Sequence, residues 1–250
     1  MHTKERRTPV TTPIDTKIHS DDTPVPMLVP GKGKTAQGRL WTYVVDNRAS
    51  GSTAPALVWY KFTPDRSGIH PQTELKAFAG LLQADGYAGY EKLYAGNRIK
   101  EVACWAHFRR KIFENHQTSP TPLTTDLLER IAALYRLEDE VRGQPPDMRR
   151  QRRQEKARPL VDDLRAAIDD ALRRLSPKSA MAKALAYGRK RWIALTRYLD
   201  DGLAEIDNNV AERAMRSVAI GRKNWLFAGS KAGGERAAAI YSVIETAKLN

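Results

Sequence analysis

The chain has one cysteine, fewer acidic than basic residues and no long apolar run. Cys104 alone excludes an intramolecular disulfide and a zinc site built from several cysteines. No apolar stretch approaches the roughly 18 residues that a membrane-spanning helix needs. The charged N-terminus MHTKERRTPV is not followed by the apolar segment of a signal peptide. These absences favour a cytoplasmic protein without a membrane partner.

The basic residues indicate what the protein binds. The 250 residues include 42 Lys and Arg against 29 Asp and Glu, a formal net charge of +13 and a pI near 9.9. A chain with this charge attracts anionic partners, and without a membrane segment we expect nucleic acid. The length is enough for one large domain or two modest ones. Hydrophobic residues make up 41%, so the composition is not that of a disordered chain.

Residues 17–120 predict a mixed α/β fold. Residues 1–16 are polar and rich in Thr and Pro, so we expect a flexible lead-in. Pro24, Pro26 and Pro30 should keep the segment after the first strand extended, and a basic loop is expected at 31–39. Apolar, aromatic and β-branched runs predict strands at 17–21, 40–45, 56–62, 81–85 and 101–106, and helical spacing predicts helices at 71–79 and 107–115.

Residues 121–200 predict helices only. Between the first two helices, residues 149–158 hold six basic groups and one acid, which predicts either a solvated loop or helix face or a phosphate contact. Apolar residues recur in three helical stripes. These are Leu127, Ile131, Leu134 and Val141; Val161, Leu164, Ile168, Leu172 and Leu175; and Met181, Leu185, Trp192, Leu195 and Leu199.

Three acids far apart in the chain are candidates for a metal site. Asp21 and Asp85 end predicted strands, and Glu212 lies in the first turns of a predicted helix. Two-metal phosphodiester cleavage needs several carboxylates that converge on ions about 3.5–4 Å apart, and Mg²⁺ prefers such oxygen ligands. Adjacent strands and a helix packed on the sheet can deliver three acids, provided that residues 121–200 are an insertion before the last helix.

Each acid also has a simpler interpretation. An isolated Asp at a strand end commonly forms a turn or caps a helix, and we expect Asp207 to be an N-cap. Glu212 could instead pair with Arg216, four residues later, on an exposed helix face.

Four segments decide between these interpretations. They are HSDDTPVPMLVPGKGKTAQGRLWTYVVD, LLQADGYAGYEKL, VACWAHFRRKIFE and IDNNVAERAMRSVAIGRKNWLFAGSKAGGERAAAIYSVIETAKLN, spread through nearly all of residues 17–250. They resemble the transposases of the insertion-sequence-66 family, bacterial DDE-type enzymes. The resemblance implies an α/β, RNase H-like mixed sheet with flanking helices and an all-helical insertion before the last catalytic helix. The core would comprise 17–120 and 201–250, with 121–200 inserted and a basic, glycine-rich tail.

The resemblance also implies an activity. It predicts a transposase that uses Mg²⁺ or Mn²⁺, with two ions, to cleave DNA and transfer strands by hydroxyl attack without a covalent protein intermediate. Asp21, Asp85 and Glu212 would be the catalytic residues and metal ligands. Relatives often carry Asp-Glu-Thr where this chain has Asp21-Asp22-Thr23, so we expect Asp21 rather than Asp22 to be the first acid. The partners would be transposon-end and target DNA and a homo-oligomer on paired ends, in the bacterial cytoplasm at the nucleoid.

Polar residues near the acids are candidates for supporting roles. The segment CWAH at 104–107 resembles a Cys-x-x-His element of several DDE transposase groups. One Cys and one His cannot complete a tetrahedral zinc site without two more ligands. His107 is either a structural cap or active-site support, and we expect Cys104 to be part of the core. Asn208 and Asn209 are further candidates for active-site support.

Basic residues are candidates for DNA contact. Arg213 and Arg216 are spaced to clamp phosphates, unless they belong to a merely exposed charged face. Trp225 and Phe227 among the following cations favour DNA. Cations near the first acid would position DNA without reading its sequence. The full set is Lys32, Lys34, Arg39, Arg213, Arg216, Arg222, Lys223 and Lys231.

Complete family members have long N-terminal regions and usually continue beyond the position of Asn250, so we expect a truncated member. Two functions remain open: an active catalytic region, or a catalytically silent DNA-binding remnant. Another RNase H-like nuclease, such as a junction resolvase, is disfavoured by the C-terminal segment.

Overall fold

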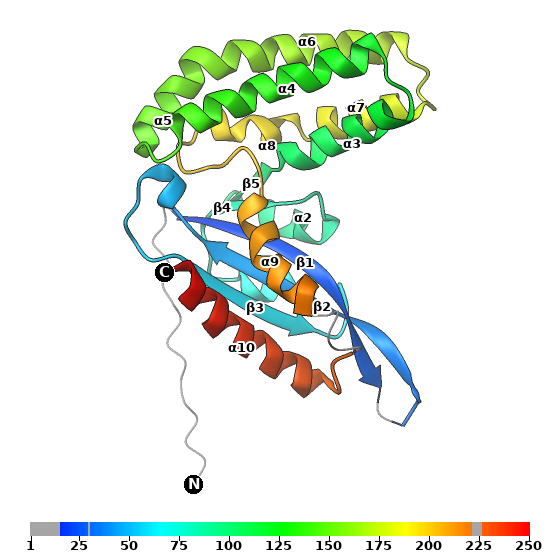
Figure 1. The fold of residues 1–250 in the computed structure, drawn as a ribbon, viewed down its shortest axis with the longest axis vertical. Coiled ribbons are helices and arrows are strands. Elements are labelled where there is room, and N and C mark those ends of the chain that lie inside the picture. Colours follow the sequence, from blue (N-terminus) through cyan, green and yellow to red (C-terminus); the bar gives the residue numbers. More distant parts are fainter. Residues whose placement is uncertain (1–15, 30, 222–226) are drawn as a thin grey trace.

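The centre of the protein is a five-stranded mixed sheet with the strand order β3-β2-β1-β4-β5. The computed structural model describes residues 16–29, 31–221 and 227–250. Strand β1 pairs antiparallel with β2 and β2 with β3, whereas β4 runs parallel to β1 and β5 parallel to β4. This arrangement confirms the predicted α/β class with an RNase H-like sheet (Figure 1). The strands are β1 (Thr16–Val29), β2 (Lys34–Val45), β3 (Leu57–Thr63), β4 (Gly80–Ala84) and β5 (Ile99–Ala103).

Strand β1 is longer than predicted. Pro24 and Pro26 lie within it and keep the chain extended, as expected, whereas Pro30 lies outside the described residues. The basic loop predicted at 31–39 is wrong, because Lys34 already begins β2. Gly31 and Gly33 have φ of 75° and 58° and make the tight turn between the strands. The result is a β1–β2 hairpin that extends beyond the rest of the sheet (Figure 1).

Alternating side chains of the strands build two separate cores. On one face, Trp41 and Tyr43 of β2 pack with Leu75 and Phe78, which follow the short helix α1 (Ile69–Glu74). The same core includes residues of α2 (Glu91–Tyr94) and the turn η2 (Ala88–Tyr90). On the other face, residues including Leu40 and Val44 pack with α9 (Asn209–Gly221) and α10 (Lys231–Leu249). The helix predicted at 71–79 therefore exists, but starts and ends earlier.

Helix α10 also covers the edge of the sheet. Strand β3 is an edge strand of the sheet. The backbone N–H groups of Val58 and Tyr60 donate to the side-chain hydroxyls of Thr246 (3.2 Å) and Ser242 (2.8 Å) on α10. A polar helix face thus satisfies backbone groups that an open edge would expose to other strands.

The remaining helices form a layer above the sheet, as Figure 1 shows. All predicted stripe residues are buried or partly buried there, and all except Val141 pack in one core with Trp105, Phe108 and Ile112 of α3. The prediction of helices alone in residues 121–200 is confirmed. The elements are α3 (Trp105–Thr118), α4 (Pro122–Val141), α5 (Pro146–Arg152), the π-helical turn η3 (Arg153–Ala157), α6 (Arg158–Arg174), α7 (Ala180–Lys190), α8 (Trp192–Thr196) and η4 (Arg197–Leu199), with η1 (Arg48–Ser50) between β2 and β3.

The basic run 149–158 differs from both alternatives, because two of its arginines are buried. The Arg153 side chain is 1% exposed and pairs with Glu138 at 2.6 Å. Arg149, also 1% exposed, pairs with Glu205 at 3.0 Å, and the fully buried Lys17 ammonium contacts the same carboxylate at 2.7 Å. Buried charges persist when they are paired in this way. The pairs join β1 and the helical layer to the segment just before α9.

Candidate active site

The structure brings Asp21 and Asp85 to neighbouring positions on the sheet. Ser20 of β1 pairs with Ala84, the last residue of the parallel strand β4. Asp21 follows Ser20 within β1, and Asp85 directly follows the end of β4. Because side chains alternate along a strand, Asp21 lies on the face occupied by Lys17 and His19, which is the face toward α9. Both acids thus lie at the carboxyl end of the parallel pair.

The carboxylates are close enough to influence one another. Burial raises the pKa of Asp21 to about 7, against the opposing effect of a hydrogen bond from the backbone N–H of Asp22. The negative charges of Asp85, Asp22 and Glu212 raise this pKa further. The three predicted acids therefore share one electrostatic environment, in which a cation would relieve the repulsion.

Asp22 lies on the opposite face and is already neutralised. Its side chain is 2% exposed and accepts hydrogen bonds from Arg39 (3.0 Å) and Arg66 (2.7 Å). The Arg66 guanidinium also lies 4.0 Å from Asp85. These pairs give Asp22 a structural partner set, and leave Asp21 as the member of the doublet that faces the other acids. Sequence reasoning missed Arg66 because nothing local connects it to Asp22.

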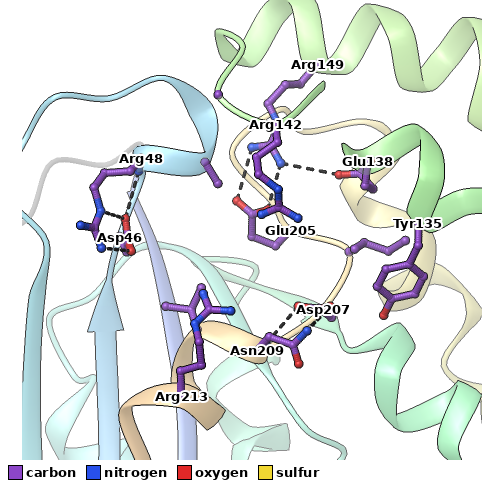
Figure 2. Close-up of a pocket in the computed structure, with 14 residues that line it drawn as sticks. Asp46, Arg48, Tyr135, Glu138, Arg142, Arg149, Glu205, Asp207, Asn209 and Arg213 are labelled. Atoms are coloured by element: carbon purple, nitrogen blue, oxygen red, sulfur yellow. Dashed lines mark hydrogen bonds and ion pairs between the residues drawn. The ribbon is translucent and has the colours of Figure 1, made fainter. Parts of the chain in front are cut away.

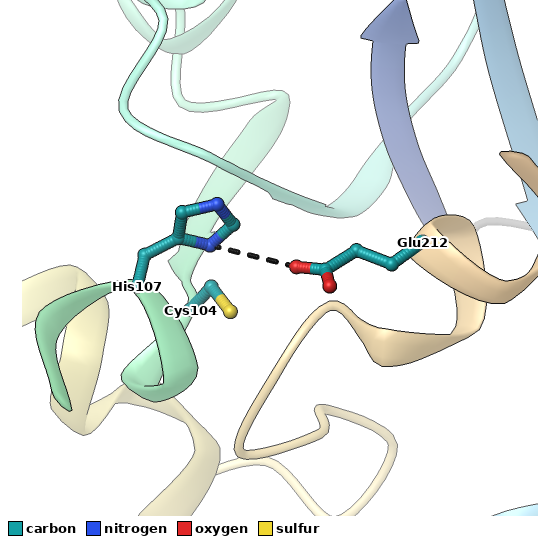
Figure 3. A group of neighbouring side chains, drawn as sticks. All are labelled: Cys104, His107 and Glu212. Atoms are coloured by element: carbon teal, nitrogen blue, oxygen red, sulfur yellow. Dashed lines mark ion pairs between the residues drawn. The ribbon is translucent and has the colours of Figure 1, made fainter. Parts of the chain in front are cut away.

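Glu212 lies on the first turns of α9 and faces α3 rather than its own helix. One carboxylate oxygen is 3.9 Å from Nδ1 of His107 (Figure 3). The other oxygen is 4.0 Å from the Arg110 guanidinium. Among the described residues, the alternative ion pair of Glu212 with Arg216 is not formed, and Arg216 is exposed. One oxygen of Glu212 is buried without a hydrogen-bond partner in the described part of the chain. An unpartnered buried carboxylate oxygen fits a cation ligand.

Asn208 places the start of α9 beside Asp21. It is fully buried. Its side-chain amide donates to the backbone carbonyl of Ser20 at 2.9 Å, and its side-chain oxygen lies 3.0 Å from Nδ1 of His19. Burial and the Lys17 ammonium lower the pKa of His19 to about 3, so the imidazole is neutral. The backbone carbonyl of Asn208 accepts a hydrogen bond from the backbone N–H of Glu212 at 3.2 Å. Asn208 thus joins the strand that carries the first acid to the helix that carries the third.

The segment before Asn208 is held by β4 as well. The Gln83 side chain accepts the backbone N–H of Glu205 at 3.0 Å and donates to its carbonyl at 2.6 Å. Burial raises the pKa of Glu205, but the charges of Lys17 and Arg149 outweigh it and hold the pKa at about 2. Polar residues inside predicted buried strands, such as Lys17, His19 and Gln83, are the sequence signal that could have revealed this attachment.

The expected N-cap role of Asp207 is wrong, and the structure rules out one of the two alternatives for His107. Helix α9 begins at Asn209, so Asp207 is not at the N-cap position. It nevertheless accepts the backbone N–H of Asn209 at 3.0 Å and the side-chain amide of the same residue at 2.6 Å. Helix α3 begins at Trp105 with Cys104 as its N-cap residue, so His107 does not cap it. Cys104 is buried, as expected, and accepts the backbone N–H of Asn208 at 3.2 Å.

A cavity of about 360 Å³ lies where the helical layer meets the sheet. Figure 2 shows Arg213, which follows Glu212 in sequence, and Asn209 at its lower rim. Asp207 accepts a hydrogen bond from the side-chain amide of Asn209 in this cavity. Most other charges that line it are paired, including Arg48 with Asp46.

The predicted DNA contacts have unequal surroundings. Lys32, Lys34, Arg213 and Arg216 are exposed. Arg39 is mostly buried by its pair with Asp22, and Lys231 lies 3.7 Å from Glu235. Arg222, Lys223 and Trp225 lie outside the described residues. DNA contact by the exposed cations stays a prediction.

Comparison with known proteins identifies the family. The sequence model of the Transposase IS66 family matches residues 14–236. The chain belongs to this family. Within the described residues, no helix has the length and apolarity to cross a membrane.

The similar curated proteins are longer than this chain. Three uncharacterized proteins of Sinorhizobium fredii (strain NBRC 101917 / NGR234) match 94% of it: y4qI at 39% identity, y4hP at 38% and y4jD at 36%. The match covers 45%, 45% and 47% of their lengths, so the chain spans about half of each relative. No solved structure matches.

Proposed function

We propose that this chain is the catalytic region of a DDE transposase, which cleaves transposon ends and joins them to target DNA. Asp21, Asp85 and Glu212 would hold two Mg²⁺ or Mn²⁺ ions. The observation that carries the proposal is the convergence of these acids from β1, β4 and α9, with the pKa of one carboxyl raised to about 7. Such mutual repulsion is what a pair of divalent cations would offset.

The bound ions would activate the attacking hydroxyl and stabilise the leaving oxygen. The protein's own residues set the geometry for this chemistry. Asn208 holds Glu212 against β1, and Arg39 and Arg66 pair with Asp22, which partly offsets its negative charge beside the site. Arg110, 4.0 Å from Glu212 and 55% exposed, is placed to meet a substrate phosphate beside the acids.

DNA would lie across the exposed cations on both sides of the acids. Lys32 and Lys34 at the hairpin tip and Arg213 and Arg216 on α9 would contact phosphates and position the strand without selecting its sequence. Action as a homo-oligomer on paired ends, in the cytoplasm at the nucleoid, belongs to the same proposal.

Metal binding and DNA cleavage should be measured separately. Calorimetry with Mn²⁺ on the purified chain should show binding that Asp85→Asn and Glu212→Gln weaken at least about tenfold, since each removes a metal ligand. Glu114→Gln, an exposed carboxylate on α3, is the matched control and should bind like the wild type. DNA bearing the element's ends should be cleaved only with Mg²⁺ or Mn²⁺ and only by the wild type and the control. Metal-independent DNA binding without cleavage, together with unchanged Mn²⁺ binding in both variants, would identify a catalytically silent remnant.

A further inference from the structure

Cys104, His107 and Glu212 form a cluster of three different metal-ligand types. One ligand atom of each residue lies within 4.8 Å of the ligand atoms of the other two. Figure 3 shows the three side chains directed into the same space between α3 and α9. Cys104 and His107 flank the first turn of α3, and the contact of Asn208 with the Cys104 sulfur brings α9 to the same place.

Two of these ligand atoms lack partners. His107 Nδ1 and Glu212 Oε1 are both buried, and neither has a hydrogen-bond partner among the residues that the structure describes. They lie 3.9 Å apart, which is too far for a hydrogen bond between them. Buried polar atoms without partners are rare in folded proteins and often indicate a missing ion or water. An ion between the two side chains would satisfy both atoms.

We propose that Cys104, His107 and Glu212 bind a thiophilic divalent transition-metal ion, of the Zn²⁺ or Co²⁺ type. Three protein ligands with a water in the fourth position make an open tetrahedral site. Bonds of about 2.0–2.3 Å at tetrahedral angles separate ligand atoms by roughly 3.3–3.6 Å. From the present spacings of up to 4.8 Å the ligand atoms need to close by at most about 1.5 Å. The Glu212 and His107 side chains, 31% and 26% exposed, have room to move.

The ligand set selects the metal. Sulfur and imidazole nitrogen favour Zn²⁺ and Co²⁺, whereas Mg²⁺ prefers oxygen ligands alone. Burial raises the pKa of the Cys104 thiol to about 12, so an arriving ion displaces the thiol proton to solvent. The backbone N–H of Asn208, 3.2 Å from the sulfur, helps to stabilise the resulting thiolate. The site is therefore distinct from the one proposed for Asp21, Asp85 and Glu212, although both use Glu212.

Sharing Glu212 has a consequence for activity. An ion bound to Cys104 and His107 withdraws this carboxylate from the Mg²⁺ site, so Zn²⁺ should inhibit Mg²⁺-dependent cleavage. This consequence rests on the proposed function, whereas binding of the transition metal does not.

Cobalt spectroscopy on the purified 250-residue chain, without an affinity tag, tests the site directly. One equivalent of Co²⁺ should produce the visible bands of a tetrahedral ion and the near-ultraviolet charge-transfer band of a cobalt–thiolate bond, and Zn²⁺ should abolish both. Cys104→Ala and Cys104→Ser should lose the charge-transfer band. His107→Ala and Glu212→Gln should weaken Co²⁺ binding by at least about tenfold.

Two controls separate this site from its neighbours. His70→Ala removes a histidine outside the cluster, where it contacts Asp65, and should leave the spectrum unchanged. Asp85→Asn should weaken Mn²⁺ binding but keep the cobalt–thiolate band, so failure of the proposed function can be told from failure of this inference. A wild-type chain, folded by circular dichroism, that gives no charge-transfer band overturns the inference. So does a band that persists with unchanged affinity in both His107→Ala and Glu212→Gln.

Discussion

The buried carboxylate of Glu205 should be a main determinant of stability. One oxygen lies 2.7 Å from the Lys17 ammonium and the other 3.0 Å from the Arg149 guanidinium, and both cations are shielded from solvent. Glu205→Gln keeps the shape but removes the charge. Removing one partner of a buried ion pair costs about 3–5 kcal/mol, because the remaining charge is left uncompensated.

The pKa of Glu205 leads to a similar magnitude. It falls from the ordinary 4.5 to about 2 in the folded protein, and a shift of this size corresponds to about 3 kcal/mol. Because the folded-state pKa is depressed, this stabilisation is fully present above about pH 4.5 and is lost as the pH falls toward 2. The stability difference between wild type and Glu205→Gln should therefore be about 3 kcal/mol near pH 6 and shrink steadily toward pH 2.

Urea denaturation at a series of pH values measures this difference. Glu140→Gln is a suitable control, since Glu140 forms an exposed pair with Lys156 at 3.1 Å and should cost less than about 1 kcal/mol. A gap under about 1 kcal/mol at pH 6, or a gap that does not narrow on acidification, would refute the assignment of Glu205 as a paired buried charge.

Three further predictions concern the site and its surroundings. Asn208→Ala removes the hydrogen bonds to His19 and to the Ser20 carbonyl, so the free energy of unfolding should fall by about 2–4 kcal/mol. Mn²⁺ affinity should fall as well although no proposed metal ligand has changed, and unaltered Mn²⁺ binding would argue against a positioning role. In metal-free protein, the raised pKa of Asp21 means that its ionisation destabilises the fold as the pH rises from about 4 through 7. Thermal melts at about pH 8 should therefore show a higher melting temperature for Asp21→Asn than for the wild type. The reverse order would contradict the mutual repulsion of the acids. A Cβ on Gly202 would collide with the Pro146 backbone, so Gly202→Ala should lower the unfolding free energy by about 1–3 kcal/mol; an unchanged denaturation midpoint would contradict this packing.

Much of the fold could be predicted because its signals are local. The β-branched and aromatic runs predicted every strand of the sheet, and the helical stripes predicted the layer above it. The boundaries were less accurate where tertiary contacts set them. Trp105 begins α3 because its N–H bonds the carbonyl of Ile206, a residue that is remote in sequence.

The basic run 149–158 shows why other features could not be predicted. A run of cations is ordinarily solvated, since burying a charge without a partner is costly. Arg149 and Arg153 are buried because Glu205 and Glu138 meet them from other elements. Nothing in the local sequence indicates these pairings.

The sequence by itself determined the α/β class, the helical layer and the identity of the three candidate acids, because local patterns and family motifs are written in consecutive residues. Only the tertiary structure showed what each residue of the doublet contacts: Asp21 lies on the face of β1 that meets α9, whereas Asp22 meets Arg39 and Arg66. It also placed Glu212, through the hydrogen bonds of Asn208 to β1. These contacts join residues far apart in the chain, and their geometry exists only after the sheet and helices have packed.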